Sequence, residues 1–278
     1  MSENCNHDCS NCSQNEECEQ RTMTKADFLI KPNAASHIRK HIGIASGKGG
    51  VGKSMVTSLL AIQMQTKVKN CAILDADITG PSIPRIFGLQ GPLQGDQNGL
   101  TPASTLTGIE VVSTNLIMDD PDQPVIWRGP VISGLVKQFY SEVNWGDIDY
   151  MFIDLPPGTG DVPLTVFQSL PMDGIIIVTT PQDLVSMVVR KAVHMAEMMD
   201  VPILGIVENM SYVICGHCGE KVELFGTQRS KDLAAELGLP LLAQLPLDPK
   251  LAAACDQGQL EEAKRPDMSA AIEAIEKA

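Results

Sequence analysis

One eight-residue segment constrains the fold of this 278-residue chain more than any other. An apolar run at residues 42–46 leads into a glycine-rich loop, and a helical stretch follows to about Gln65. The loop consists of Gly47, Lys48, Gly49, Gly50, Val51, Gly52, Lys53 and Ser54, and it matches the pattern G-x-x-x-x-G-K-[S/T]. Glycines let backbone N–H groups turn inward around phosphate oxygens, and the helix N-terminus adds the positive end of its dipole. The segment therefore predicts a phosphate-binding loop (P-loop).

Three side chains of the loop have the chemistry that a nucleoside triphosphate requires. Lys53 can neutralise β- and γ-phosphate oxygens, and the Ser54 hydroxyl can ligate Mg²⁺. Lys48 occupies a position where the pattern accepts any residue. A cation there can stabilise charge on a transferred phosphoryl group, with a solvated lysine as the alternative. We therefore expect a nucleoside triphosphate and Mg²⁺ to bind here, with catalytic roles for Lys48 and Lys53.

Short apolar runs alternate with helical stretches from residue 41 onwards. After the first run, they lie at residues 71–75, 109–113, 150–154, 174–180, 202–208 and 241–245. Runs of this length between helices are typical of a mostly parallel sheet that is buried on both faces. We therefore expect an α/β P-loop NTPase domain over residues 37–278. Residues 1–36 are polar and form a disordered or metal-ordered N-terminal arm and linker in this interpretation.

Carboxylates follow two of the predicted strands. Asp75 ends the run at 71–75 and Asp77 follows two residues later, while Asp154 ends the run at 150–154. Ligands of parallel sheets bind at the carboxyl ends of the strands. We expect Asp154 to hold Mg²⁺ through a water, Asp75 to be a second outer-shell acid, and Asp77 to orient or activate the attacking water. A cap or turn role is the alternative for each of them.

Two residues after the second acidic strand end complete this prediction. Gly158 can donate its N–H to the γ-phosphate and so sense hydrolysis, as switch loops do. Asp161 is interpreted as a helix N-cap rather than a catalytic residue.

The composition excludes several classes of protein. The chain has 21 Lys and Arg against 34 Asp and Glu, a formal net charge of −13, which repels nucleic acid and anionic lipid. Aromatic residues make up only 4% of the chain, too few for a base-stacking surface. No apolar run approaches the ~18 residues that span a bilayer, and the first twenty residues lack the features of a signal peptide. We expect a cytoplasmic protein that binds neither nucleic acid nor membrane.

The eight cysteines are clustered in a way that indicates metal ligands rather than disulfides. Four of them form a complete ligand set in the N-terminal arm: Cys5, Cys9, Cys12 and Cys18. Because the surrounding residues cannot form a core, a metal would be the main source of order there. Zinc and an unligated arm remain alternatives. Cys71 lies in a strand run and Cys255 in a helix, so both are interpreted as structural.

Cys215 and Cys218 form a C-x-x-C pair between small residues. Two thiols complete neither a tetrahedral zinc site nor a four-thiolate cluster, whereas a symmetric dimer would supply four. A shared zinc ion and a redox dithiol remain alternatives. Redox pairs usually begin a helix, but residues 220–224 have the composition of a short strand. We interpret His217 as a spacer.

Together these motifs resemble the MinD/ParA-like ATPases, whose P-loop has a second lysine at the position of Lys48. Further segments narrow the resemblance to the Mrp-type iron–sulfur cluster carrier ATPases. They lie at residues 75–84, 127–130, 153–161 and 208–211, and the resemblance extends over about residues 38–260.

The resemblance implies a homodimer with ATP near the interface. Lys48 would reach the partner's nucleotide, Asn209 would read the adenine, and residues 246–248 would border the base. Cys215 and Cys218 would hold a labile [4Fe–4S] cluster that bridges the two copies.

The resemblance also implies a more stable [4Fe–4S] cluster on the N-terminal cysteines. The gap between Cys5 and Cys9 is shorter than in relatives with this extension, so Cys5 fits the pattern least and His7 is a possible substitute.

We therefore expect a slow ATPase that passes an iron–sulfur cluster to apoproteins. Three alternatives remain open at this stage. The first is an ATP-gated electron donor resembling nitrogenase iron protein, and the second is a positioning ATPase that acts on membrane or DNA. The third is a zinc-stabilised regulatory NTPase.

Overall fold

The computed structural model describes residues 25–67, 69–118, 129–181, 185–224 and 229–278. The four N-terminal cysteines and the Trp127-Arg128 pair lie outside these ranges. In the part of the chain that is described, no helix is long and apolar enough to cross a bilayer.

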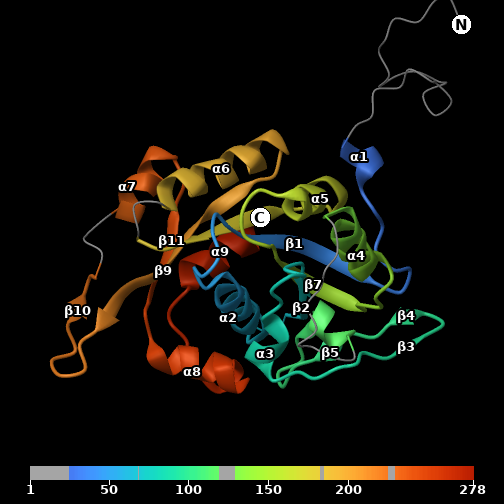
Figure 1. Ribbon diagram of the computed structural model, residues 1–278, viewed down its shortest axis with the longest axis horizontal. Coiled ribbons are helices and arrows are strands. Elements are labelled where there is room, and N and C mark those ends of the chain that lie inside the picture. The colour runs from blue at the N-terminus through green and yellow to red at the C-terminus, as the bar shows by residue number, and fades with distance from the viewer. Residues whose placement is uncertain (1–24, 68, 119–128, 182–184, 225–228) are drawn as a thin grey trace, which may run out of the picture.

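Nine strands of the described ranges form one sheet. Its order is β10-β9-β8-β1-β7-β2-β6-β5, and β11 also pairs with β9 (Figure 1). The strands are β1 (His37–Ser46), β2 (Cys71–Asp75), β5 (Ala103–Ser104), β6 (Glu110–Val112), β7 (Asp147–Asp154), β8 (Gly174–Thr179), β9 (Ile203–Ile214), β10 (Lys221–Val222) and β11 (Leu241–Pro246). All neighbours are parallel except β5 on β6 and β10 on β9. A separate two-stranded hairpin consists of β3 (Gly95–Asp96) and β4 (Gly99–Leu100).

Helices cover both faces of the sheet, and each face has its own apolar core (Figure 1). One core includes residues of α4 (Gly129–Ser141), α5 (Asp161–Ser169), α6 (Val185–Met198) and α7 (Arg229–Glu236). The other includes residues of α2 (Lys53–Gln65), α3 (Ile83–Phe87), α8 (Pro249–Gln257) and α9 (Ser269–Lys277). The short helices are α1 (Lys25–Phe28), η3 (Thr114–Leu116) and η4 (Leu260–Glu262). This layering explains the continuous apolar runs, since every residue of β2 and β8 is buried.

The expected α/β P-loop fold with a mostly parallel sheet is confirmed. Each of the seven apolar runs overlaps a strand of this sheet. The largest boundary differences are that β1 and β7 begin before their runs, at His37 and Asp147, and that β9 continues beyond the predicted end at Glu208 to Ile214, where it pairs with β10. The predicted N-cap role of Asp161 is wrong. Gly160 is the N-cap residue of α5, and Asp161 is the first helical residue, whose charge lies at the positive end of the helix dipole.

Candidate functional site

The glycine-rich loop joins the end of β1 to the start of α2, as the sequence predicts. Gly50 and Gly52 have φ angles of 79° and 78°, a left-handed conformation that glycine adopts without a steric penalty. A Cβ atom on Gly47 would lie 2.6 Å from Val188 Cγ1 on α6. The loop therefore needs glycine for its backbone turn and for the close approach of α6.

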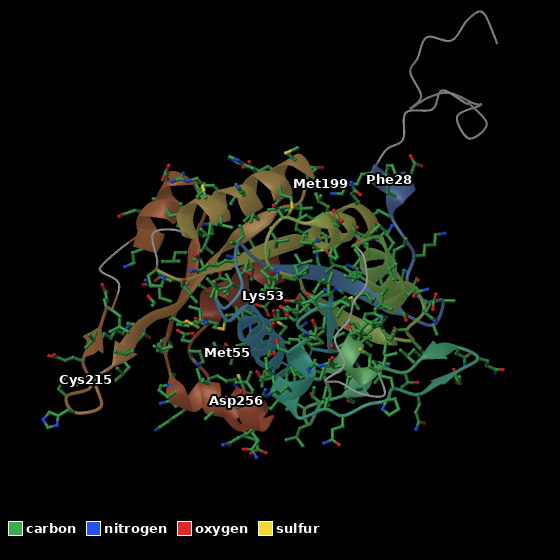
Figure 2. All side chains as sticks on the ribbon, viewed as in Figure 1. Phe28, Lys53, Met55, Met199, Cys215 and Asp256 are labelled. Atoms are coloured by element: carbon green, nitrogen blue, oxygen red, sulfur yellow. The ribbon has the colours of Figure 1, made fainter. Side chains whose placement is uncertain are left out.

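A cavity of about 480 Å³ lies over this loop. Figure 2 shows Lys53 near the centre of the molecule, with Met55 and Asp256 toward α8. Seven residues of the loop, from Lys48 to Ser54, line the cavity, and Ser46, Met55 and Asp77 join them. Its outer wall comes from α3 and α8 through residues that include Arg85, Ala252, Cys255 and Asp256. Arg85 and Asp256 form an exposed ion pair at 3.2 Å across this wall.

Lys53 is buried beside two carboxylates. Its Nζ lies 2.8 Å from Asp154 Oδ2 and 3.6 Å from Asp77 Oδ2. These contacts are ion pairs, and Nζ has no hydrogen-bond partner of normal geometry among the described residues. A buried ammonium of this kind is poised to bond a phosphate oxygen in the cavity.

Asp154 joins the loop to β7 through two hydroxyl groups. Ser54 Oγ donates to Asp154 Oδ2 over 2.5 Å, and Thr57 Oγ1 donates to Asp154 Oδ1 over 2.7 Å. The Ser54 hydroxyl and the Asp154 carboxylate are oxygen donors of the type that Mg²⁺ prefers. The residues present therefore fit the predicted Mg²⁺ site. Thr57 was not among the predicted site residues, although its place one helical turn after Lys53 puts it on the same face of α2.

Asp75 and Asp154 lie side by side at the ends of β2 and β7. Asp75 is completely buried, accepts a hydrogen bond from Ser113 Oγ at 2.9 Å, and accepts another from the Asp77 N–H at 3.1 Å. Burial and the negative charge of Asp154 raise the pKa of Asp75 to about 8, against the opposing effects of Lys53 and Ser113. Burial also raises the pKa of Asp77, again with Lys53 opposing. Raised carboxylate pKa values beside a phosphate site favour roles in proton transfer.

The raised pKa of Asp75 predicts a pH-dependent stability. The folded protein holds this proton up to about pH 8, whereas an unfolded aspartate loses it near pH ~4. The stabilising contribution is therefore complete below about pH 4 and is lost as the pH rises through about 8. Asp75→Asn stays neutral throughout. Relative to the unchanged protein, its free energy of unfolding is expected to rise by on the order of 1 kcal/mol or more between pH 5 and 9.

Urea unfolding without nucleotide or Mg²⁺ measures this difference. Asp147→Asn is the matched control, because Asp147 is exposed at the start of β7. A stability difference between Asp75→Asn and the unchanged protein that stays constant over this pH range would contradict the prediction.

Asn209 lies in β9 and contacts the P-loop at Val51 and Gly52. Its Nδ2 donates to the Val51 carbonyl oxygen over 2.9 Å and lies 2.3 Å from an ideal Cβ on Gly52. Its Oδ1 is buried and has no hydrogen-bond partner among the described residues. Asn209 does not line the 480 Å³ cavity, and neither do residues 246–248. Asp248 instead caps α8 by accepting the Lys250 N–H at 2.8 Å.

Gly158 lies near the loop but its N–H is already engaged. It donates to the Ser46 carbonyl oxygen over 2.8 Å, and the Gly158 φ angle is 89°. The predicted bond from Gly158 to a γ-phosphate therefore requires this bond to break. Lys48 lies directly after Gly47, is partly exposed and lines the cavity. Its reach to a partner's nucleotide stays a prediction.

Cys215 and Cys218 lie at the tip of the hairpin formed by β9 and β10. Figure 2 shows that this hairpin projects away from the body of the molecule, with Cys215 at its far end. The tip is closed by hydrogen bonds from the Cys215 N–H to the Glu220 carbonyl and from the Gly219 N–H to the Cys215 carbonyl, both 2.9 Å. Backbone N–H groups of Cys218 and His217 lower the pKa of the Cys215 thiol. The thiolate, which is the metal-binding form, is thereby favoured.

No three His, Cys, Asp or Glu side chains in the described ranges come together as a metal site. The two hairpin thiols therefore lack further ligands from this part of the chain. The short strand predicted after them is confirmed as β10, which differs from the helix usual after a redox C-x-x-C pair.

The other cysteines have different outcomes. The N-terminal set, Cys5, Cys9, Cys12 and Cys18, lies outside the described residues and stays a prediction. Cys71 is buried in β2, where burial raises the pKa of its thiol to about 12. Cys255 is part of α8 as expected, but it also lines the nucleotide cavity, which no local pattern indicated.

Comparisons with known proteins agree with this geometry. The family described as NUBPL iron-transfer P-loop NTPase, of the ParA group, matches residues 37–278. The chain belongs to this family. The resemblance inferred from the motifs is thus confirmed, and the match includes both the P-loop and the hairpin thiols of this NTPase.

Individual relatives of the NTPase span most of its length. The iron–sulfur cluster carrier protein of Clostridium perfringens is 42% identical over 266 residues, which cover 91% of this chain and 93% of the relative. A nucleotide-binding protein from Archaeoglobus fulgidus, solved in complex with ADP, is 43% identical with a TM-score of 0.74, covering 83% of this chain and 90% of that one. The cell division ATPase MinD of Pyrococcus furiosus is 19% identical with a TM-score of 0.60, covering 86% and 98%, which shows the fold alone.

Proposed function

We propose that this NTPase hydrolyses ATP and carries a [4Fe–4S] cluster that it delivers to apoproteins. The observation that carries the proposal is the presence, in one chain, of a P-loop cavity and of a projecting hairpin with two thiols and no further ligands among the described residues. A relative 42% identical to this chain is named an iron–sulfur cluster carrier protein, which supports the same assignment.

The proposed hydrolysis uses the residues around the cavity in distinct roles. Lys53 neutralises phosphate oxygens from its buried position, and Lys48 reaches the nucleotide of a second copy in this proposal. Ser54 and Asp154 would hold Mg²⁺, which supplies charge neutralisation on the phosphates. Asp77 lines the cavity and orients the attacking water, while Asp75 supports it as an outer-shell acid.

The proposed cluster site requires two copies of the chain. Cys215 and Cys218 supply two thiolates, and a second copy related by a twofold axis supplies the other two. Exposed apolar side chains flank the thiols on this hairpin: Ile214, Val222 and Leu224, each between 44% and 51% exposed. Such side chains suit burial in an interface around the cluster. The N-terminal cysteines would hold a second cluster on the arm.

A transfer assay tests the proposed function. Protein reconstituted with iron and sulfide without oxygen is mixed with an apoprotein that gains activity when it receives a [4Fe–4S] cluster. The expected result is recovery of that activity at a rate that changes with MgATP. Recovery no faster than with free iron and sulfide would contradict the proposal.

We expect Asn209 to select adenine through its unpartnered acceptor. Asn209→Asp keeps the size of the side chain but replaces the donor to the Val51 carbonyl with a charged oxygen. Loss of this bond and repulsion between the two oxygens are expected to weaken ATP binding about 10-fold or more, which corresponds to roughly 1–3 kcal/mol. Titration with ATP and GTP measures affinity and base preference. Asn144→Asp, between α4 and β7, is the control. Unchanged ATP affinity together with an unchanged preference for ATP over GTP in Asn209→Asp would refute this role.

A further inference from the structure

β9 connects the P-loop to the thiol hairpin, because Asn209 lies in it and Cys215 follows directly after its end. The strand is irregular between these two points. Three residues separate Glu208 from Tyr212 in β9, whereas one residue separates their partners Gln244 and Pro246 in β11. β9 therefore contains a bulge of two extra residues.

Met210 lies at the centre of this bulge in an uncommon conformation. Its φ angle is 55°, in the left-handed region that residues with a Cβ rarely adopt. A backbone of this kind persists only where the surrounding structure holds it in place. Side-chain contacts should therefore hold the bulge in this conformation.

Hydrogen bonds among the side chains of Glu208, Ser211 and Gln244 are those contacts. Residues three apart in a regular strand point to opposite faces, yet here Ser211 Oγ donates to Glu208 Oε2 over 2.5 Å. Gln244 Nε2 donates to the same carboxylate oxygen over 2.7 Å and to Ser211 Oγ over 3.2 Å. Glu208 is 2% exposed and Ser211 is 7% exposed. The Glu208–Ser211 bond is possible only because the bulge turns Ser211 back.

Both ends of the bulge are tied to functional elements. On one side, Asn209 bonds the Val51 carbonyl and packs against Gly52, so a movement of the loop has to move Asn209. On the other side, the Leu247 N–H donates to the Tyr212 carbonyl over 2.7 Å, and the next two residues of β9 pair with β10. The thiol pair follows at once.

We propose that Glu208, Ser211 and Gln244 form a hydrogen-bonded positioning network that transmits the position of the P-loop to the Cys215–Cys218 hairpin. The three side chains hold the bulge as one rigid piece, so a displacement of Asn209 caused by nucleotide binding changes the position of the hairpin. Under the proposed function, this is how nucleotide occupancy alters how tightly the hairpin thiols bind an iron–sulfur cluster.

Hydrogen exchange of the full chain, prepared without an iron–sulfur cluster, tests the proposal. Exchange of the hairpin segment 212–222 is measured with and without saturating MgADP and with a non-hydrolysable ATP analogue. In the unchanged protein, nucleotide is expected to change exchange of this segment severalfold. In Ser211→Ala this difference is expected to disappear, while nucleotide affinity stays within about twofold. Ser211→Thr keeps the hydroxyl and is expected to restore the difference.

Ser141→Ala is the matched control, because it removes a hydroxyl bonded to a backbone carbonyl in the remote helix α4. If Ser211→Ala does not fold, Gln244→Met removes the other donor to Glu208 and is expected to reduce the nucleotide-dependent difference. A full difference in folded Ser211→Ala, or none in the unchanged protein, would overturn the proposal. Hydrogen exchange is measured without an iron–sulfur cluster, so its result does not depend on the carrier function. Failure of the carrier function is recognised separately, because Cys215 and Cys218 would then bind no iron.

Discussion

Replacement of Lys53 by alanine is expected to lower the rate of ATP hydrolysis by about 10²- to 10³-fold. The buried ammonium lies 2.8 Å from Asp154 Oδ2 and 3.6 Å from Asp77 Oδ2, and Lys53 lines the cavity. Its removal takes away the charge that neutralises the phosphate oxygens. ATP turnover and nucleotide affinity, measured on the same preparations, check this prediction.

The same substitution leaves buried carboxylates without their cation, so it is also expected to destabilise the fold without nucleotide by ~3 kcal/mol. Lys53→Arg separates the two effects. It keeps the positive charge and most of the stability, but its planar, larger head group does not fit the loop and hydrolysis stays low. Lys67→Ala, which removes an exposed ion pair with Glu276 at the end of α2, is the control. Near-normal turnover in folded Lys53→Ala would show that the cavity is not the hydrolytic site.

Replacement of both Cys215 and Cys218 by serine is expected to abolish cluster delivery, with at least a ~10-fold loss in transfer rate. Serine oxygen is a poor ligand for iron in these clusters, and no group of three or more His, Cys, Asp or Glu side chains that could hold a metal occurs among the described residues. Nucleotide affinity is expected to be unchanged, because the hairpin tip projects away from the cavity. Iron content, sulfide content and transfer rate are the measurements.

Cys255→Ser provides the matched cysteine control for that experiment. This thiol is partly buried in α8 and lines the nucleotide cavity, so its loss is expected to leave iron content and cluster transfer intact. Normal delivery by the Cys215→Ser, Cys218→Ser double variant would mean that the cluster is carried elsewhere in the chain.

Local patterns were sufficient to predict the part of the site that follows strand ends. The P-loop, Asp75 and Asp154 come together because the carboxyl ends of adjacent parallel strands meet at one edge of the sheet. The apolar runs of this sheet could be predicted because helices cover both of its faces. The short strand after the C-x-x-C pair could be predicted from its composition.

The remainder depends on contacts between distant residues. The wall formed by α3 and α8 depends on backbone packing between Gly88 and Gly258, where a Cβ on Gly258 would lie 2.5 Å from Gly88 Cα. The continuation of β9 beyond Glu208 could not be predicted, because polar side chains such as Ser211 interrupt the apolar run there. In the structure, Glu208 and Ser211 bond each other and Gln244 of β11.

In the proposed function, two chains share one iron–sulfur cluster through Cys215 and Cys218. A variant in which Cys5, Cys9, Cys12 and Cys18 are all serine tests this sharing, because its bound iron reports on the hairpin thiols. After anaerobic reconstitution, we expect about two irons per chain and a mass in solution twice that of one chain. An iron-loaded protein with the mass of a single chain and with both hairpin thiols free to react would contradict the account.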